Sequence, residues 1–151
     1  MQTILVASDA PTLRREIEAV ISGPDVTVQA VRSGPEVVAF VLHEPPDLVI
    51  VDMQMGNMGG MAVCLELRLQ ESYFAMEHVA VLMLLDRRPD VFLARRSGAE
   101  GWLVKPLDPL RLRRAVRALL DEETYADDSY LPVPVLVGAG PQLQAGLAPT
   151  S

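Results

Sequence analysis

Three charged residues of this chain lie at or just after the end of apolar runs that are typical of β-strands. Asp52 closes the run 48–51, Asp9 follows the run 3–7, and Lys105 follows the run 102–104. In an open parallel sheet, the carboxyl ends of the strands form the crevice where ligands bind. The sequence therefore predicts an acidic pocket in which two carboxylates meet one ammonium group. The competing interpretation makes Asp52 a strand-end acid that only caps the turn after it.

Five strand-like runs alternate with five segments of helical periodicity over about 120 residues, as expected for an α/β fold. The run 48–52 is apolar without interruption before Asp52, which indicates a strand buried on both faces. The run 26–30 alternates apolar and polar residues, which favours a half-exposed edge strand. Parallel strands need helical crossovers on both faces of the sheet, so the sequence predicts a doubly wound parallel sheet. The expected strands cover residues 3–7, 26–30, 48–52, 79–85 and 102–104.

The composition favours a single domain in a reducing compartment. The chain has 151 residues, half of them hydrophobic, and a net charge of −7. No run reaches the roughly 18 apolar residues of a membrane span, and an acidic chain does not favour general binding to nucleic acid. The lone Cys64 lies in an apolar segment and is interpreted as a buried hydrophobe. We expect a cytoplasmic protein that contacts neither membranes nor, directly, nucleic acid.

Three motifs together resemble the receiver domain of bacterial two-component response regulators, of which CheY is a member. They cover residues 4–9, which end in Ser8-Asp9, residues 46–52, which end in Asp52, and residues 98–109, which contain Lys105-Pro106. The resemblance extends over about residues 2–120, so we expect a receiver-like domain at residues 1–120. It implies a flavodoxin-like fold: a doubly wound five-stranded parallel sheet of order 2-1-3-4-5 with five helices.

The resemblance also implies roles for the residues at the strand ends. Asp52 matches the aspartate that accepts a phosphoryl group from a histidine kinase, and Lys105 matches the lysine that pairs with the phosphoryl oxygens. Asp9, Asp52 and the backbone carbonyl of Gln54 match the groups that hold Mg²⁺, which prefers oxygen ligands. Lys105 is the only lysine among the 13 basic residues of the chain. Because no Gly-rich phosphate loop follows the first strand, neither a nucleotide nor a flavin cofactor is expected.

Two positions depart from the family pattern. Ser8 replaces one of the two acids after the first strand, so it can contribute to a metal site only weakly, through a water molecule. Leu85 stands where receivers carry a Ser or Thr that bonds the phosphoryl group, and Asp86 stands where a small residue is normal. Leu85 cannot donate such a bond, and its bulk is expected to fill the space that the switch aromatic, here Trp102, enters on activation.

These departures lead to two hypotheses of different classes. The first is a degenerate receiver, or pseudo-receiver, that acts as a protein–protein interaction module, is not an enzyme and binds Mg²⁺ weakly at most. The alternative is a functional phosphoacceptor that catalyses transfer of a phosphoryl group from a histidine kinase to its own Asp52. Residues 121–151 are too few for a DNA-binding output domain, so none is expected there.

A basic surface and a tail are expected to serve partner binding. In receivers, the fourth helix, fifth strand and fifth helix form the usual surface for dimers and outputs. Six arginines of this chain are expected there: Arg95, Arg96, Arg111, Arg113, Arg114 and Arg117. Residues 121–151 form an acidic and then apolar, proline-containing tail. We expect it to be partly flexible and otherwise extended, held against its own domain or a second copy, with its acids near the arginines. The expected partners are other signalling proteins, a histidine kinase among them, or a second copy of this chain in a homodimer.

Overall fold

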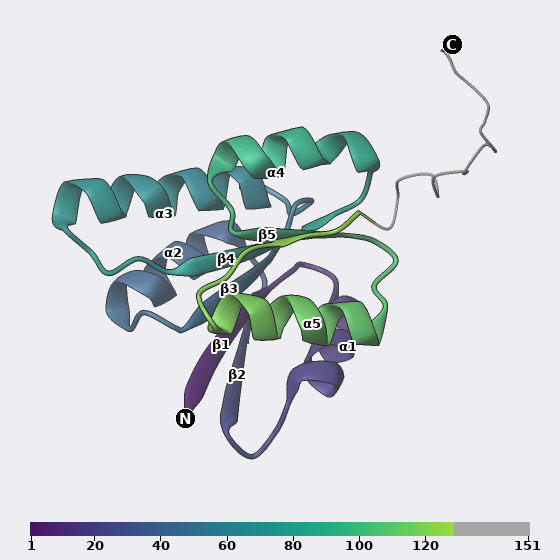
Figure 1. The fold of residues 1–151 in the computed structure, drawn as a ribbon. Helices are drawn as coiled ribbons and strands as arrows, with labels where there is room; N and C mark the ends of the chain where they lie inside the picture. The colour runs from purple at the N-terminus through teal and green to yellow at the C-terminus, as the bar shows by residue number, and fades with distance from the viewer. Residues whose placement is uncertain (129–151) are drawn as a thin grey trace, which may run out of the picture.

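A central parallel sheet separates two layers of helices (Figure 1). The computed structural model of the protein describes residues 1–128. Its elements follow one another in this order: β1 (Gln2–Ala7), α1 (Pro11–Ile21), β2 (Val26–Val31), α2 (Gly34–His43), β3 (Leu48–Asp52), α3 (Gly60–Phe74), β4 (Ala80–Leu85), the short 3₁₀ turn η1 (Arg88–Asp90), α4 (Val91–Ser97), β5 (Gly101–Val104), α5 (Pro109–Leu120) and β6 (Tyr125–Ala126). The doubly wound, flavodoxin-like α/β fold is therefore confirmed.

The sheet has the order β2-β1-β3-β4-β5-β6, and all its neighbouring strands run parallel. The first five strands have the predicted order 2-1-3-4-5. The expectation of five strands was one short, because Tyr125 and Ala126 pair with Gly101 and Trp102 and add a sixth strand at the edge. A two-residue strand has too short a pattern to be predicted from periodicity.

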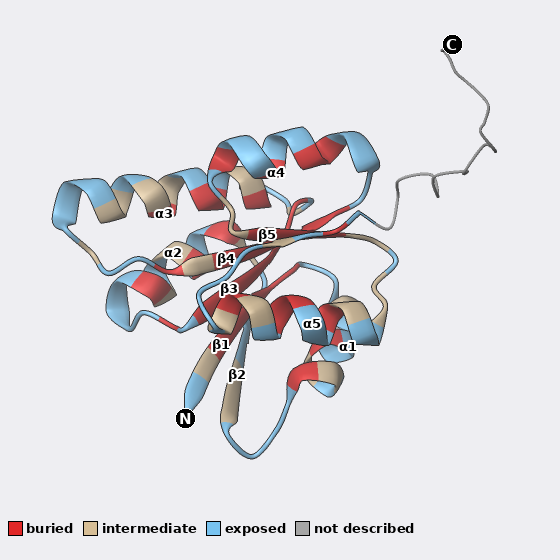
Figure 2. Ribbon diagram, viewed as in Figure 1, coloured by how far each residue is buried: buried red, intermediate tan, exposed pale blue. Residues whose placement is uncertain are grey.

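Two apolar cores lie on opposite faces of the sheet (Figure 2). The core under α2, α3 and α4 contains Val51, Leu67 and Trp102, and the core under α1 and α5 contains Ile4, Ile17 and Leu112. Every residue of β3 is buried, as its unbroken apolar run predicted, whereas β2 is half-exposed at the edge. The position of β3 between β1 and β4 places Asp52 inside the edge formed by the carboxyl ends of the strands.

Local sequence signals fix where the helices begin. Ser33 accepts a hydrogen bond from the backbone N–H of Glu36, and the Glu36 side chain accepts one from the backbone N–H of Arg32, so the first turn of α2 is capped from both sides. Asp108 caps α5 through one such bond, which its side chain accepts from the backbone N–H of Leu110. At Gly60, an added Cβ would lie 2.7 Å from the carbonyl oxygen of Asp52, so only glycine lets α3 begin this close to the end of β3.

Candidate functional site

The side chain of Asp52 lies at the carboxyl end of β3 and is almost completely buried, with 4 % of its surface exposed. Its Oδ1 accepts hydrogen bonds from Lys105 Nζ at 2.7 Å and from the backbone N–H of Gln54 at 3.3 Å. Its Oδ2 accepts one from the hydroxyl of Ser8 at 2.9 Å. Hydrogen-bond donors offset the cost of burying a carboxylate, and here they come from residues that follow β1, β3 and β5.

Lys105 connects two carboxylates across the strand ends. Its Nζ lies 2.7 Å from Asp52 Oδ1 and 3.1 Å from Asp86 Oδ1. Burial lowers the pKa of Lys105, but the hydrogen bonds and charges of Asp52 and Asp86 outweigh burial, so the pKa lies above its ordinary value of 10.5. The ammonium group is therefore charged at neutral pH and already paired on two sides.

Asp9 lies at the same edge of the sheet, but its side chain contacts another loop. It is exposed, and its Oδ2 accepts a hydrogen bond from the backbone N–H of Gly56 at 3.1 Å, which ties the end of β1 to the loop after β3. Ser8 is fully buried and also accepts a bond from the N–H of Ala10 at 3.1 Å. Within residues 1–128, no three His, Cys, Asp or Glu side chains converge in a way that could hold a metal ion.

The donor set is correct in type for a hard cation but low in charge. The carboxylates of Asp9 and Asp52 and the carbonyl of Gln54 are oxygen ligands of the kind Mg²⁺ prefers. Ser8, however, adds a neutral hydroxyl where a third carboxylate would add charge, and this hydroxyl is already bonded to Asp52. These residues would fit a weakly held Mg²⁺ ion.

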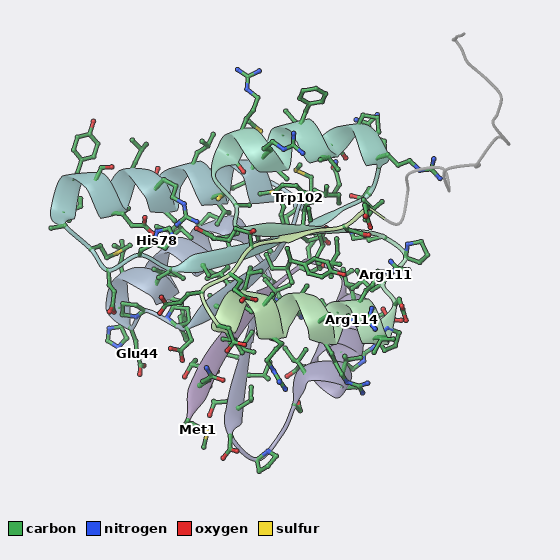
Figure 3. The ribbon with its side chains drawn as sticks, viewed as in Figure 1. Met1, Glu44, His78, Trp102, Arg111 and Arg114 are labelled. Atoms are coloured by element: carbon green, nitrogen blue, oxygen red, sulfur yellow. The ribbon has the colours of Figure 1, made fainter. Side chains whose placement is uncertain are left out.

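Leu85 is fully buried at the end of β4 and belongs to the same apolar core as Val91, Ala94 and Trp102. Trp102 is itself buried, with 8 % of its surface exposed, and the guanidinium of Arg95 lies 5.5 Å from the centre of its ring. Figure 3 shows Trp102 on the α4 side of the sheet. The position that the family resemblance assigns to a phosphoryl-binding hydroxyl therefore carries apolar packing in this chain.

The six arginines of the expected partner surface do not all face one way. Arg95 covers Trp102, whereas Arg113 on α5 reaches toward α1, where its Nε lies 3.4 Å from the carbonyl oxygen of Val20. Arg114 and Arg117 are exposed beside Arg113 on α5, and Arg96 is exposed on α4. Figure 3 places Arg111 and Arg114 on α5, below the sheet, and Trp102 above it.

The start of the acidic tail is attached to this region. Asp127 is buried, and its Oδ2 accepts a hydrogen bond from the backbone N–H of Val104 at 2.9 Å and lies 3.8 Å from Nη1 of Arg111. The rest of the expected tail, residues 129–151, which includes its apolar, proline-containing part, lies outside the described residues. Asp127 thus continues the attachment that β6 makes to β5.

Asp86 and Asp127 are contacts that sequence reasoning missed. Asp86 follows β4 directly, so its place at a strand end was a signal that it could reach the pocket. Asp127 offered no such signal, because its partners come from β5 and α5 and depend on how β6 docks.

Cys64 is buried, and burial raises the pKa of its thiol, which keeps it unreactive.

The sheet order defines an α/β domain of the flavodoxin-like type, and a buried aspartate pairs with a lysine where two of its strands end. Comparison with known proteins makes the class definite. The family model described as "Response regulator receiver domain" matches residues 4–117. The chain belongs to this family, whose members are signalling modules of two-component systems that interact with histidine kinases and other signalling proteins.

Individual relatives agree with this assignment. The nitrate/nitrite response regulator protein NarL of Escherichia coli K12 is 29 % identical over 133 residues, which are 87 % of this chain and 60 % of NarL. The DNA-binding response regulator MtrA of Mycolicibacterium smegmatis is 32 % identical over 121 residues, which are 79 % of this chain and 50 % of MtrA. The chain therefore spans between half and three fifths of the length of these two relatives.

Solved structures share the fold. The chemotaxis response regulator CheY4 of Vibrio cholerae superposes with a TM-score of 0.69 at 25 % identity, and the superposed part covers 79 % of this chain and 98 % of the CheY4 chain. A response regulator of Chloroflexus aurantiacus gives a TM-score of 0.72 at 24 % identity, over 80 % of this chain and 98 % of its own. None of the helices within residues 1–128 combines the length and the apolar character that crossing a membrane requires.

Proposed function

We propose that this receiver domain has a degenerate phosphorylation site and acts as a protein–protein interaction module. The observation that carries the proposal is the pair of substitutions at the end of β4. Leu85 puts buried apolar atoms where a hydroxyl would bond the phosphoryl group, and Asp86 puts a carboxylate 3.1 Å from Lys105. An incoming phosphoryl group would have to displace Asp86 from Lys105 and would meet its negative charge.

The same residues argue for weak use of Mg²⁺. Asp9, Asp52 and the Gln54 carbonyl would hold the ion, and Ser8 would reach it only through a water molecule. When bound, the ion would neutralise negative charge on a phosphoryl group. Lys105 and the hydroxyl of Ser8 already neutralise and bond the Asp52 carboxylate, which reduces the gain from adding a cation.

The alternative function is that of a working phosphoacceptor. It is favoured by the contact of Asp52 with Lys105 at 2.7 Å, because this pairing orients the carboxylate and holds a positive charge next to it. In that case Asp52 would accept a phosphoryl group from a histidine kinase, and the domain would pass the signal on without a hydroxyl at position 85.

One experiment separates the two functions. The protein is incubated with Mg²⁺ and acetyl phosphate, its intact mass is measured over time, and Asp52→Asn serves as the matched control. We expect no stable gain of one phosphate in either protein. A stable gain in the wild type that disappears in Asp52→Asn would instead establish the phosphoacceptor function.

For the partner surface, we propose the edge formed by α4, β5 and α5, with β6 regulating access to it. The support is that Tyr125 and Ala126 occupy the free edge of β5, and that Asp127 bonds Val104 and lies near Arg111. A partner or a second copy that uses this edge would have to displace β6. Because the contacts here are backbone pairing and ion pairs, we propose protein partners and not nucleic acid for this surface.

A further inference from the structure

A second cluster of charged side chains lies around His78, just before β4 and therefore at the end of the sheet opposite Asp52 (Figure 3). The His78 ring lies between two carboxylates. Its Nδ1 is 2.9 Å from Oε1 of Glu71 on α3, and its Nε2 is 2.5 Å from Oε2 of Glu100, which directly precedes β5. Both ring nitrogens therefore face an acceptor.

Arg68 on α3 organises the same two carboxylates. Its Nη1 bonds Glu71 at 2.7 Å, and its Nη2 bonds Glu100 at 2.7 Å. The guanidinium also donates to the carbonyl oxygen of Val79, at 2.9 Å, and to that of Gly98, at 3.0 Å from Nη2. Gly98 ends α4 in the left-handed conformation, with φ of 86°, so the cluster holds the last turn of α4.

The carboxylates are in turn bonded to the start of β4. Glu71 accepts from the backbone N–H of Val79 at 3.1 Å, and Glu100 accepts from the backbone N–H of Val81 at 2.9 Å. The cluster thus joins α3, β4, the end of α4 and the start of β5. His78 is the one member of the four that changes charge near neutral pH.

The protonation state of His78 decides whether both of its contacts are favourable. A neutral imidazole carries one N–H donor, whereas an imidazolium carries two. Only the imidazolium can donate to Glu71 and Glu100 at once. In the neutral ring one lone pair must face a carboxylate at close range, and the donor that Arg68 offers to Nδ1 lies farther away, at 3.5 Å against 2.9 Å for Glu71. We propose that His78, Glu71, Glu100 and Arg68 form a proton-dependent latch that fastens α3 to the end of α4 and the start of β5.

The direction of the pH effect follows from the surroundings of the ring. Burial lowers the pKa of His78, but the hydrogen bonds to Glu71 and Glu100 outweigh burial and the opposing charge of Arg68, so the pKa lies above its ordinary value of 6.5. A raised pKa means that the folded state binds the proton more tightly than the unfolded state. The stabilisation is complete below about pH 6.5 and is lost as the pH rises through the folded pKa.

The other charged groups near His78 are acidic. A cavity of about 620 Å³ is lined by His78 and Glu100 together with four further carboxylates, Asp47, Glu77, Glu122 and Glu123. None of the residues that line this cavity is a lysine or an arginine. The cation that faces the ring is Arg68, whose Nη1 lies 3.5 Å from Nδ1 of His78. These carboxylates come from the loops before β3, before β4 and after α5.

The latch acts on the partner surface proposed above from a distance. Glu100 stands two residues before Trp102, and Trp102 contacts Arg95 of α4. Loosening the end of α4 above the pKa of His78 would therefore free the α4 and β5 edge without any change at Asp52. The inference does not depend on whether Asp52 is phosphorylated.

The test begins with the wild-type chain. The ring resonances of its two histidines are followed by NMR from pH 5 to pH 9, and each is assigned with His78→Gln or His43→Gln. We expect the His78 midpoint to lie above pH 6.5 in the wild type and to fall in Glu100→Gln. A wild-type midpoint at or below pH 6.5 would overturn the latch, and this result does not require any variant to fold.

The second measurement connects the proton to the structure. Urea unfolding is measured at pH 5.5 and pH 8.5 for the wild type, His78→Gln and the control His43→Gln, which lies on the exposed end of α2. Each unit by which the pKa of His78 is raised changes the folding equilibrium constant up to about tenfold, and solvent screening reduces this for a side chain that is 58 % exposed. We expect the ratio of the folding equilibrium constants of the wild type and His78→Gln to be several-fold smaller at pH 8.5 than at pH 5.5. At pH 5.5 we also expect the amide of Glu100 to exchange faster in His78→Gln than in the wild type. A constant advantage at both pH values, or unchanged exchange at Glu100, would refute the proposal.

Discussion

Replacing Leu85 by Thr tests whether a missing hydroxyl is what keeps the site from responding to a phosphoryl group. Leu85 is fully buried in the core that contains Val91 and Trp102, so the substitution changes both packing and polarity. Leu85→Val is the matched control, because valine and threonine have the same shape and differ only in one methyl and one hydroxyl group.

The expected cost can be worked out in two steps. Shortening Leu to Val removes about one methylene and leaves a small void, which costs about 1 kcal/mol. Exchanging a methyl for a hydroxyl in the same buried place costs a further 1–3 kcal/mol or so if the hydroxyl finds no partner. Domains of this size are stable by about 5–15 kcal/mol, so both variants are expected to fold. Urea denaturation measures both steps.

The gain is measured with Mg²⁺ and beryllofluoride, which stands in for a phosphoryl group on Asp52, using the fluorescence of Trp102. We expect no response from the wild type or from Leu85→Val. In Leu85→Thr, a hydrogen bond from the hydroxyl to a charged group contributes about 1.5–3 kcal/mol, or about ten- to a hundredfold in affinity. Equal binding by the Thr and Val variants would show that the hydroxyl is not the missing part, and a strong response from the wild type would refute the reasoning as a whole.

Three further predictions concern the pocket and the sixth strand. Asp86→Asn keeps the shape of the side chain but removes its charge, so it should increase the affinity for beryllofluoride when it is added to Leu85→Thr, the variant expected to respond in the fluorescence titration. Equal affinity with and without Asp86→Asn in that variant would exclude competition for Lys105. Lys105→Met leaves the buried carboxylate of Asp52 without its cation and should lower the free energy of unfolding at pH 7 by about 1–3 kcal/mol, as measured in urea; a neutral effect would mean that the ion pair contributes nothing net. Asp127→Ala leaves the N–H of Val104 without its acceptor, so it should lower the free energy of unfolding by about 1–3 kcal/mol and speed amide exchange at Val104. Deletion of residues 121–151 should have the same two effects and also expose the β5 edge. If neither change alters stability, oligomeric state or partner binding, β6 does not control that edge.

Much of the pocket was predictable because strand ends are marked in the sequence. The apolar run before Asp52 and the short runs before Asp9 and Lys105 place these residues at one edge of any parallel sheet. The structure brings Asp52 and Lys105 within 2.7 Å of each other, whereas Asp9 turns toward Gly56. Periodicity fixes which end of a strand a side chain occupies, but it does not fix the partner that the side chain selects there.

The sequence by itself determined the fold class, the strand order through its family motifs, and the positions of Asp52 and Lys105, because these depend on local patterns of apolar and polar residues. Only the tertiary structure decided the contacts between groups distant in the chain. Lys105 pairs with Asp86 as well as Asp52, Asp127 bonds Val104, and His78 lies between Glu71 and Glu100. Each of these contacts depends on how a loop or a helix end packs against the sheet. That geometry is fixed by the packing of the whole domain and cannot be read from the spacing of residues along the chain.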